Sequence, residues 1–305
     1  MFLFSNLDSK LTNILCILAS PRKNGYSARL LNQVIDGIES YDSVRCELVH
    51  LYEHDIRPCA SCWSCIRDEE HRCVLNDSMG ASGEGELFNQ ILEANGIFVS
   101  QPVYFGKPPA ITQLFFERFY PFKWSGELSG IPFASISQAA NNGGARTANA
   151  EMRRWASIFC LKYVGGLPVH LVQFEAALSR ANHLGRKIAE AARKDSKNRI
   201  KIAEKHRYLG TVENPWSSLE SAIMDITNGT FNFEDSLIEY ALSHNTVKEK
   251  ESIELLKKAS EELKLTLYYY RLRNLEKASE HLVKTRSFWG PATFKEFLED
   301  EIWHK

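Results

Sequence analysis

Four of the seven cysteines of this chain lie within fifteen consecutive residues. The segment CASCWSCIRDEEHRC places them at Cys59, Cys62, Cys65 and Cys73, with gaps of two, two and seven residues between them. Thiols spaced this closely could bind a metal ion or an iron–sulfur cluster, form a disulfide, or be reduced thiols that happen to be neighbours. Which of these holds depends on the compartment and on the segments nearby.

The composition indicates an ordinary globular protein in a reducing compartment. The chain has 305 residues, 44% hydrophobic and 25% charged, and its net charge of −1 gives no reason to expect nucleic acid or an anionic membrane as partner. No apolar run is long enough to span a bilayer, and the start of the chain lacks the features of a signal peptide. We therefore expect a cytoplasmic protein, in which clustered cysteines favour metal or redox chemistry over structural disulfides.

A polar turn in ILCILASPRKNGYS is a second candidate site, because a buried strand there gives way to a helix that starts near Ser27. The turn brings hydroxyls and backbone N–H groups to a helix N-terminus, where the macrodipole favours an anion. Arg22 adds a planar charged group suited to phosphate. The spacing matches neither the Walker turn nor the dinucleotide fingerprint. The turn predicts a phosphate site, and the alternative is an ordinary strand-to-helix connection capped by Ser27.

Two more loops follow expected strands. SQPVYFGKPPA (100–110) presents a tyrosine and a phenylalanine on a loop bounded by glycine and proline. SQAANNGGAR (137–146) offers two asparagines and a glycine pair whose backbone can approach a ligand closely. In a doubly wound sheet, ligands bind beyond the carboxyl ends of the strands. Together, the three loops suit a planar heterocycle that carries a phosphate.

Strands and helices alternate over the first two thirds of the chain. Strands are expected at 14–19, 44–51, 96–100, 132–137 and 167–172, and helices at 27–38, 87–94, 109–119, 145–160 and 175–194. Five such repeats predict an α/β fold with an open, doubly wound parallel sheet.

After about residue 200 the sequence becomes helical and charge-rich. Helices are expected at 214–226 and 230–242, then as one long helix at 247–283, and as a short last helix after FWGP (288–291). The predicted domains are residues 1–198, with the cysteine loop at 57–79, and a helical C-terminal domain at 199–305.

The segments SPRKNGYS, SQPVYFGKPPA…FFERF and NNGG resemble, in order and approximate spacing, the flavodoxin-like NADPH-dependent FMN reductase family. The resemblance covers residues 12–195 and implies a flavodoxin-like, five-stranded sheet that binds FMN. It implies that the FMN phosphate is held by Ser20, Arg22, Gly25, Tyr26 and Ser27, that the isoalloxazine ring is lined by Pro102, Val103, Tyr104, Phe105 and Gly106, and that Asn141, Gly143 and Gly144 face its pyrimidine edge. The family's usual Gly-Asn-Thr is Gly-Tyr-Ser here, which keeps a hydroxyl.

The cysteines resemble those of the iron–sulfur flavoproteins, a branch of this family with a 4Fe–4S cluster beside FMN. That resemblance implies that Cys59, Cys62, Cys65 and Cys73 are the cluster ligands. The nearby Arg57, Arg67 and Arg72 would offset the negative charge of the thiolates and the cluster. Clusterless thiols, found in many flavodoxin-like relatives, stay open as an alternative. So does zinc or a redox disulfide, although zinc ligands usually form two pairs with a longer spacer.

No catalytic acid or base is predicted, because a flavin would carry the chemistry itself, and we interpret Glu117 and Arg118 as a helix-end ion pair. The sequence predicts an FMN-dependent oxidoreductase that passes electrons between NAD(P)H or ferredoxin and an acceptor, through FMN and a 4Fe–4S cluster. The resemblance implies a homodimer or homotetramer. The alternatives are a clusterless NAD(P)H-dependent FMN or quinone reductase, and a non-enzymatic flavin-based redox sensor whose helical domain binds a partner.

Overall fold

The structure is a computed structural model that describes residues 11–80, 85–140, 143–195 and 232–304. The chain divides into two compact units, Met1–Ile202 and Ala203–Lys305. The domain boundary predicted at residue 198 and the helix predicted at 214–226 lie outside the described residues.

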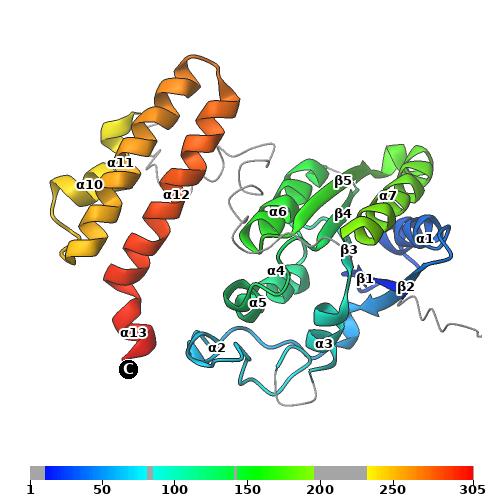
Figure 1. The fold of residues 1–305 in the computed structure, drawn as a ribbon. Coiled ribbons are helices and arrows are strands. Elements are labelled where there is room, and N and C mark those ends of the chain that lie inside the picture. Colours follow the sequence, from blue (N-terminus) through cyan, green and yellow to red (C-terminus); the bar gives the residue numbers. More distant parts are fainter. Residues whose placement is uncertain (1–10, 81–84, 141–142, 196–231, 305) are drawn as a thin grey trace, which may run out of the picture. The chain divides into compact units, whose positions relative to one another are not determined.

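A five-stranded parallel sheet forms the centre of the first unit (Figure 1). Its strands are β1 (Thr12–Leu18), β2 (Val44–His50), β3 (Gly96–Pro102), β4 (Pro132–Ala139) and β5 (Lys162–His170). They lie in the order β2-β1-β3-β4-β5, so the direction in which strands are added reverses beside β1. Every residue of β1 is buried, as expected for a strand covered on both faces. The predicted flavodoxin-like, doubly wound sheet is confirmed.

Helices cover both faces of this sheet. On one face lie α1 (Tyr26–Ile38) and α7 (Phe174–Asp195), whose apolar residues share a core with β1 and β4. On the other face lie α3 (Glu86–Glu93), α4 (Ala110–Glu117), α5 (Tyr120–Ser125) and α6 (Ala145–Ile158). This second core is rich in aromatic rings, of which Phe88 and Phe122 stack with centroids 4.6 Å apart. The two layers hold the carboxyl ends of the strands, and the loops that follow them, in fixed positions.

Several predicted element boundaries differ from the observed ones, and two of these differences have a clear physical cause. β5 starts at Lys162 rather than at residue 167, because an edge strand is only half buried and needs no apolar run. The helix predicted at 109–119 ends at Glu117, and a separate helix, α5, follows with Pro121 in its first turn. Proline has no N–H to continue the preceding helix, so a new helix begins there.

The second unit is helical. It contains a 3₁₀ turn, η4 (Phe233–Asp235), and the helices α10 (Leu237–Ser243), α11 (Lys250–Arg271), α12 (Leu275–Phe297) and α13 (Glu299–Trp303). The long helices α11 and α12 form an antiparallel hairpin (Figure 1), with Leu263, Leu267 and Leu282 buried in its core. The predicted helical C-terminal region is therefore present. Within the described residues, no helix combines the length and apolarity needed to cross a membrane.

The prediction of one helix over 247–283, ended by FWGP, is wrong. The chain turns at Arg273, which has a φ of 59°, and Asn274 caps α12 by accepting a hydrogen bond from the backbone N–H of Lys277 at 3.2 Å. α12 then continues through Pro291. Trp289 and Ala292 pack into the core on either side of this proline, and this packing keeps the helix in place where its backbone loses a donor.

Candidate functional site

The polar turn between β1 and α1 presents an open helix N-terminus. Gly25 precedes α1 without a side chain to cap it, and the first turn of the helix carries no acidic residue. Ser20 and Ser27 are buried in the turn, whereas Arg22 is exposed. Backbone donors without a side-chain cap, in a first helical turn without acidic side chains, fit a phosphate group.

His50 holds this turn from the end of β2, a role that the sequence did not reveal. Its Nε2 lies 2.6 Å from the carbonyl oxygen of Ser20. Its Nδ1 lies 3.6 Å from the carboxylate of Glu53, which also pairs with Lys23 of the turn. The only signal is a histidine at the end of a strand, and it becomes informative once β2 is known to lie beside β1.

The loop after β3, residues 102–107, is a tight turn with an aromatic tip. Tyr104 and Lys107 exchange two backbone hydrogen bonds of 3.0 Å. Phe105 lies between them with a φ of 52°, and its side chain is fully exposed. The backbone N–H of Val103 donates to the carbonyl of Gln138 at 2.8 Å, which ties the loop to β4. A phenyl group held outward in a strained turn offers an apolar face to a planar ring.

The loop after β4 lies against the loop after β3. Gly143 and Gly144 have φ values of 86° and 88°, and a Cβ on Gly144 would lie 2.6 Å from the Cα of Gly106. On the paired ends of β3 and β4, buried Gln101 donates to the Ser137 hydroxyl at 3.2 Å, while its Oε1 has no hydrogen-bond partner within the described residues. Asn141, predicted to face the ring, lies outside the described residues.

These residues fit FMN. The other predicted flavin residues lie at the carboxyl ends of β1, β3 and β4 as expected: Ser20, Arg22, Gly25, Tyr26, Ser27, Pro102, Val103, Tyr104, Phe105, Gly106, Gly143 and Gly144. The uncapped N-terminus of α1 suits the phosphate, and the exposed phenyl group of Phe105 suits the ring. The buried Oε1 of Gln101 could accept a hydrogen bond from the bound group. Bound FMN would supply hydride and single-electron chemistry at its ring.

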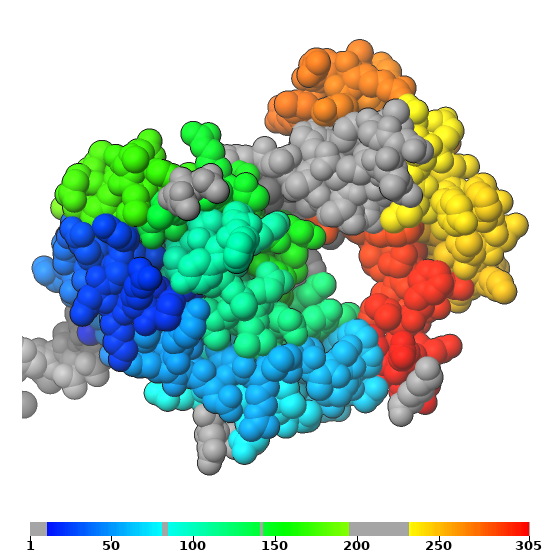
Figure 2. Space-filling view, turned by 180° about the vertical axis from the view of Figure 1, so that it is seen from behind, coloured from blue at the N-terminus to red at the C-terminus, as the bar shows by residue number. Residues whose placement is uncertain are grey.

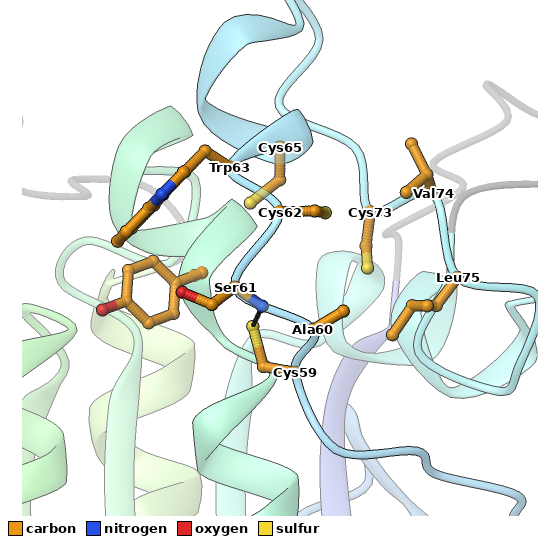
Figure 3. Close-up of a pocket in the computed structure, with 10 residues that line it drawn as sticks. Cys59, Ala60, Ser61, Cys62, Trp63, Cys65, Cys73, Val74 and Leu75 are labelled. Carbon is orange, nitrogen blue, oxygen red and sulfur yellow. Dashed lines mark hydrogen bonds between the residues drawn. The ribbon is translucent and has the colours of Figure 1, made fainter. Parts of the chain in front are cut away.

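The four clustered cysteines surround one pocket after β2 (Figure 3). The segment runs through the 3₁₀ turn η1 (Leu51–Glu53) and the short helix α2 (Ser64–Arg67), and forms part of the molecular surface (light blue in Figure 2). The pocket is lined by Cys59, Ala60, Ser61, Cys62, Trp63, Cys65, Cys73, Val74, Leu75 and Tyr120. Trp63 and Tyr120 meet edge to face with ring centroids 6.2 Å apart. Four thiols therefore share one cavity that aromatic rings partly border.

Left-handed backbone turns aim the cysteines. Ser61, Trp63 and His71 have φ values of 50°, 59° and 53°, although none of them is glycine. Such residues cost free energy and persist where the surrounding structure imposes them, often at functional sites. Here they reverse the chain between successive cysteines, which brings sulfurs separated in sequence to the same pocket.

The thiols influence one another electrostatically. Burial, and after it the charges of the neighbouring Cys73, Cys59 and Cys62 sulfurs, together raise the pKa of Cys65 to about 12. The pKa of Cys62 is lowered, first by hydrogen bonding from Ser64 and also by the charge of Arg67. Without a cation, several thiolates around one pocket repel each other, and a bound metal centre would remove that repulsion.

The donor set fits an iron–sulfur or other thiolate-bound metal centre, but its geometry is open. In the part of the chain that the structure describes, no three cysteine, histidine or carboxylate side chains are arranged so that they could already hold a metal ion. The four sulfurs would therefore have to move closer together when a metal centre binds. A bound cluster would supply single-electron exchange.

The end of α4 holds both ends of the cysteine segment. The Arg118 guanidinium pairs with Asp77 and donates to the Cys73 sulfur at 3.2 Å. Glu117 accepts the backbone N–H of Cys59 at 2.9 Å. The interpretation of Glu117 and Arg118 as a mutual helix-end ion pair is therefore wrong, because each is used by a partner far away in sequence. Asp77 could not be recognised from the sequence, because a lone aspartate in a loop carries no pattern.

Two of the three arginines expected to offset the cysteine charge have other partners. Arg57 pairs with Asp55 at 3.6 Å, and Arg72 lies 3.9 Å from Glu127 with its guanidinium over the Phe88 ring. Arg67 does act on Cys62, as described above. Arg118, from outside the segment, makes the direct contact with a cysteine sulfur.

Comparison with known proteins identifies the family of the first unit. The model of the family described as NADPH-dependent FMN reductase matches residues 12–175. An iron–sulfur flavoprotein of Methanocaldococcus jannaschii is 24% identical over 195 residues, which cover 59% of this chain and 97% of that protein. An iron–sulfur flavoprotein of Archaeoglobus fulgidus is 30% identical over 184 residues, 57% of this chain and 78% of that protein.

Solved structures with similar folds include a flavone reductase, 17% identical with a TM-score of 0.47 over 62% of this chain and 65% of that one. Another is an NAD(P)H:quinone oxidoreductase from Methanothermobacter marburgensis, 17% identical with a TM-score of 0.43 over 58% of this chain and 96% of that one. The family match spans more than half of the chain, and the resemblance noted in the sequence is confirmed. The chain therefore belongs to the NADPH-dependent FMN reductase family and is an FMN-dependent oxidoreductase of its iron–sulfur flavoprotein branch.

Proposed function

We propose that this protein transfers electrons between a reduced donor, NAD(P)H or ferredoxin, and an acceptor, using FMN and a 4Fe–4S cluster bound by Cys59, Cys62, Cys65 and Cys73. The observation that carries the proposal is the gathering of these four cysteines around one pocket at the end of β2. β2 lies beside β1, whose turn is suited to the flavin phosphate. Both groups would therefore be held on the same rim of one sheet.

The chain's own residues would bind and orient these groups. The N-terminus of α1 would hold the phosphate, and Tyr104 and Phe105 would border the ring. The α4 end would fix the cysteine segment through Glu117 and Arg118. No described side chain needs to act as an acid or base, because the electron chemistry belongs to the cofactors.

The location and assembly are part of the same proposal. Seven cysteines without a disulfide among the described residues suit a cytoplasmic setting that keeps thiols reduced. We expect a homodimer or homotetramer, which light scattering of the purified protein would show.

Stepwise anaerobic reduction, followed by absorption, tests the proposal. Flavin and cluster bands bleach at different points of the titration, so two separable transitions are expected. Replacing Cys65 with serine should remove the cluster transition and leave the flavin transition, because the phosphate turn and ring loop are untouched. A wild-type protein with a flavin transition alone would contradict the cluster.

A clusterless NAD(P)H-dependent FMN or quinone reductase is the second candidate. The open arrangement of the sulfurs within the described residues favours it. It predicts full NAD(P)H oxidation with a quinone in iron-free protein, and unchanged turnover in the Cys65→Ser variant. Loss of turnover in that variant would exclude it.

A further inference from the structure

We propose that Glu117 and Arg118 are positioning residues for the cysteine ligands, and that the charge of Arg118 raises the reduction potential of the metal centre they hold. This inference rests on the proposed function. It assigns a role to the end of α4, a helix that supplies none of the predicted ligands and none of the predicted flavin contacts.

Arg118 makes contacts to three separate parts of the cysteine segment. One guanidinium nitrogen donates to the carbonyl of Arg57 at 2.8 Å, and the other donates to the Cys73 sulfur at 3.2 Å. Both nitrogens also bond the carboxylate of Asp77. The side chain of Arg118 is 1% exposed and that of Asp77 is 0% exposed, so these contacts are shielded from water. A buried planar fork can hold this many partners only in one orientation.

Asp77 carries the same network back to the main chain of the segment. Its carboxylate accepts the backbone N–H of Arg57 at 2.9 Å and that of Met79 at 3.0 Å. The segment is thus closed into a loop whose start and end meet at the Arg118–Asp77 pair. The cysteines lie on the part of the chain between these two ends.

Glu117 fixes the first cysteine in a similar way. Its Oε1 accepts the backbone N–H of Cys59 at 2.9 Å. Two consecutive residues at the end of α4 therefore hold the first and the last of the four clustered cysteines. The two middle cysteines are placed by the left-handed turns described above.

The same helix begins close to the flavin loop. α4 starts at Ala110, four residues after Gly106 of the aromatic turn, and is eight residues long. A helix of that length spans about 12 Å. The ring loop and the cysteine segment are therefore attached to opposite ends of one short rigid element, which fixes the spacing between the two predicted redox groups.

Stability alone does not explain a charged residue at this position. Replacing a buried ion pair with apolar residues of similar volume is often neutral or stabilising. A positively charged group that hydrogen-bonds a ligand sulfur, however, stabilises the more reduced and more negative state of a metal centre. Hydrogen bonds to the sulfurs are one of the known determinants of cluster potential.

Amide hydrogen exchange in iron-free protein tests the positioning role without any cofactor. Arg118→Gln should make the amides of residues 57–79 exchange at least about tenfold faster, because a hydrogen bond to a charged group normally contributes more than that factor. Arg118→Lys, which keeps the charge but loses the fork, should give a smaller increase. Arg154→Gln is the matched control, since Arg154 is an exposed arginine on α6 that pairs with Glu151. Unchanged exchange in both Arg118 variants would overturn the positioning role.

Glu117 allows a rescue experiment. Glu117→Ala removes the acceptor for the Cys59 amide, so exchange of that amide should accelerate. Glu117→Gln keeps an oxygen at the same place and should restore slow exchange. Equal acceleration in both variants would show that the charge of Glu117, rather than its hydrogen bond, matters, and would overturn this part of the proposal.

Reconstituted protein tests the electrostatic role. Arg118→Gln should load less iron and sulfide, and its loaded fraction should show a lower midpoint potential than wild type. Arg118→Lys should keep the wild-type midpoint potential, because the positive charge remains. If Arg118→Gln fails to fold, the midpoint potential is compared between Arg118→Lys and wild type. A purely structural residue would lower the loading and leave the potential of the loaded fraction unchanged, which would overturn the electrostatic role.

Failure of the proposed function would look different. Wild-type protein that takes up no iron during reconstitution would refute the cluster, whatever the variants do. The exchange experiments would still decide whether Glu117 and Arg118 position the cysteine segment, because those contacts are made by the chain's own residues.

Discussion

The Cα of Gly106 and the backbone of Gly144 are so close that a Cβ on Gly144 would lie 2.6 Å from that Cα. This contact joins the loops after β3 and β4, which border the predicted flavin ring. Gly144→Ala should push the loops apart and weaken FMN binding by roughly tenfold or more, since the φ of 88° adds about 1 kcal/mol of strain to the clash. Fluorescence titration of the iron-free protein with FMN measures this.

Gly143→Ala is the matched control for that variant. Gly143 has nearly the same φ, 86°, but a Cβ there would meet no atom of the described residues within 4 Å. It carries the same backbone strain without the clash, so its FMN affinity should fall clearly less. Equal losses in the two variants would mean that the Gly106–Gly144 contact does not shape the site.

Phe105→Ala should weaken FMN binding without lowering the melting temperature of the FMN-free protein. The side chain is fully exposed, so its removal leaves no cavity. Its contact with the flavin ring should be worth roughly 1 kcal/mol beyond its buried area, about a fivefold change in affinity. Val172→Ala, at another exposed apolar position, should change neither quantity. An unchanged FMN affinity in Phe105→Ala would remove this residue from the site.

The Asp77–Arg118 pair predicts a pH dependence of stability. Burial alone would raise the pKa of Asp77, but hydrogen bonds from Arg118 and from the backbone of Arg57 and Met79 outweigh it and lower the pKa. A carboxyl with a lowered folded-state pKa stabilises the fold above its unfolded value, about 3.9, and this stabilisation is lost as the pH falls below it.

Asp77→Asn should therefore be less stable than wild type at pH 7. The gap in melting temperature should narrow as the pH is lowered below about 4, because the wild-type carboxyl then becomes protonated. Thermal unfolding of both proteins over that pH range provides the measurement. A gap that stays constant with pH would show that the charge of Asp77 does not stabilise the fold.

Leu263→Ala tests the core of the helical hairpin. Leu263 is fully buried between α11 and α12, so its truncation should cost about 2–5 kcal/mol and speed amide exchange across the hairpin. Leu265→Ala, the same change on the same helix at a side chain 40% exposed, should have little effect. FMN binding reports whether the first unit stays intact. Similar exchange in the two variants would contradict the packing described here.

The sheet could be predicted because its strands are buried on both faces. The run ILCIL in β1 has no polar interruption, and parallel pairing then follows from the intervening helices. The division of the predicted long helix into α11 and α12 was harder to predict, because apolar residues continue at helical spacing through the turn between them. The turn itself is made by Arg273, which has a left-handed backbone but lacks the usual glycine signal.

The site was predictable where local motifs define it. Helix starts, glycine pairs and clustered cysteines can be recognised from spacing alone. The contacts of Arg118 with Asp77 and Cys73 could not, because they join residues 41 and 45 positions apart and depend on how a loop packs on a helix. Likewise, His50 became recognisable only through the strand order that places it beside Ser20.

The content of FMN, iron and acid-labile sulfide per chain, measured on protein prepared without oxygen, shows whether the chain holds both redox groups. One FMN with about four irons and four sulfides is expected in wild type, and FMN without iron when Cys73 is replaced by serine. Wild-type protein that binds FMN but neither carries nor takes up iron would contradict this expectation.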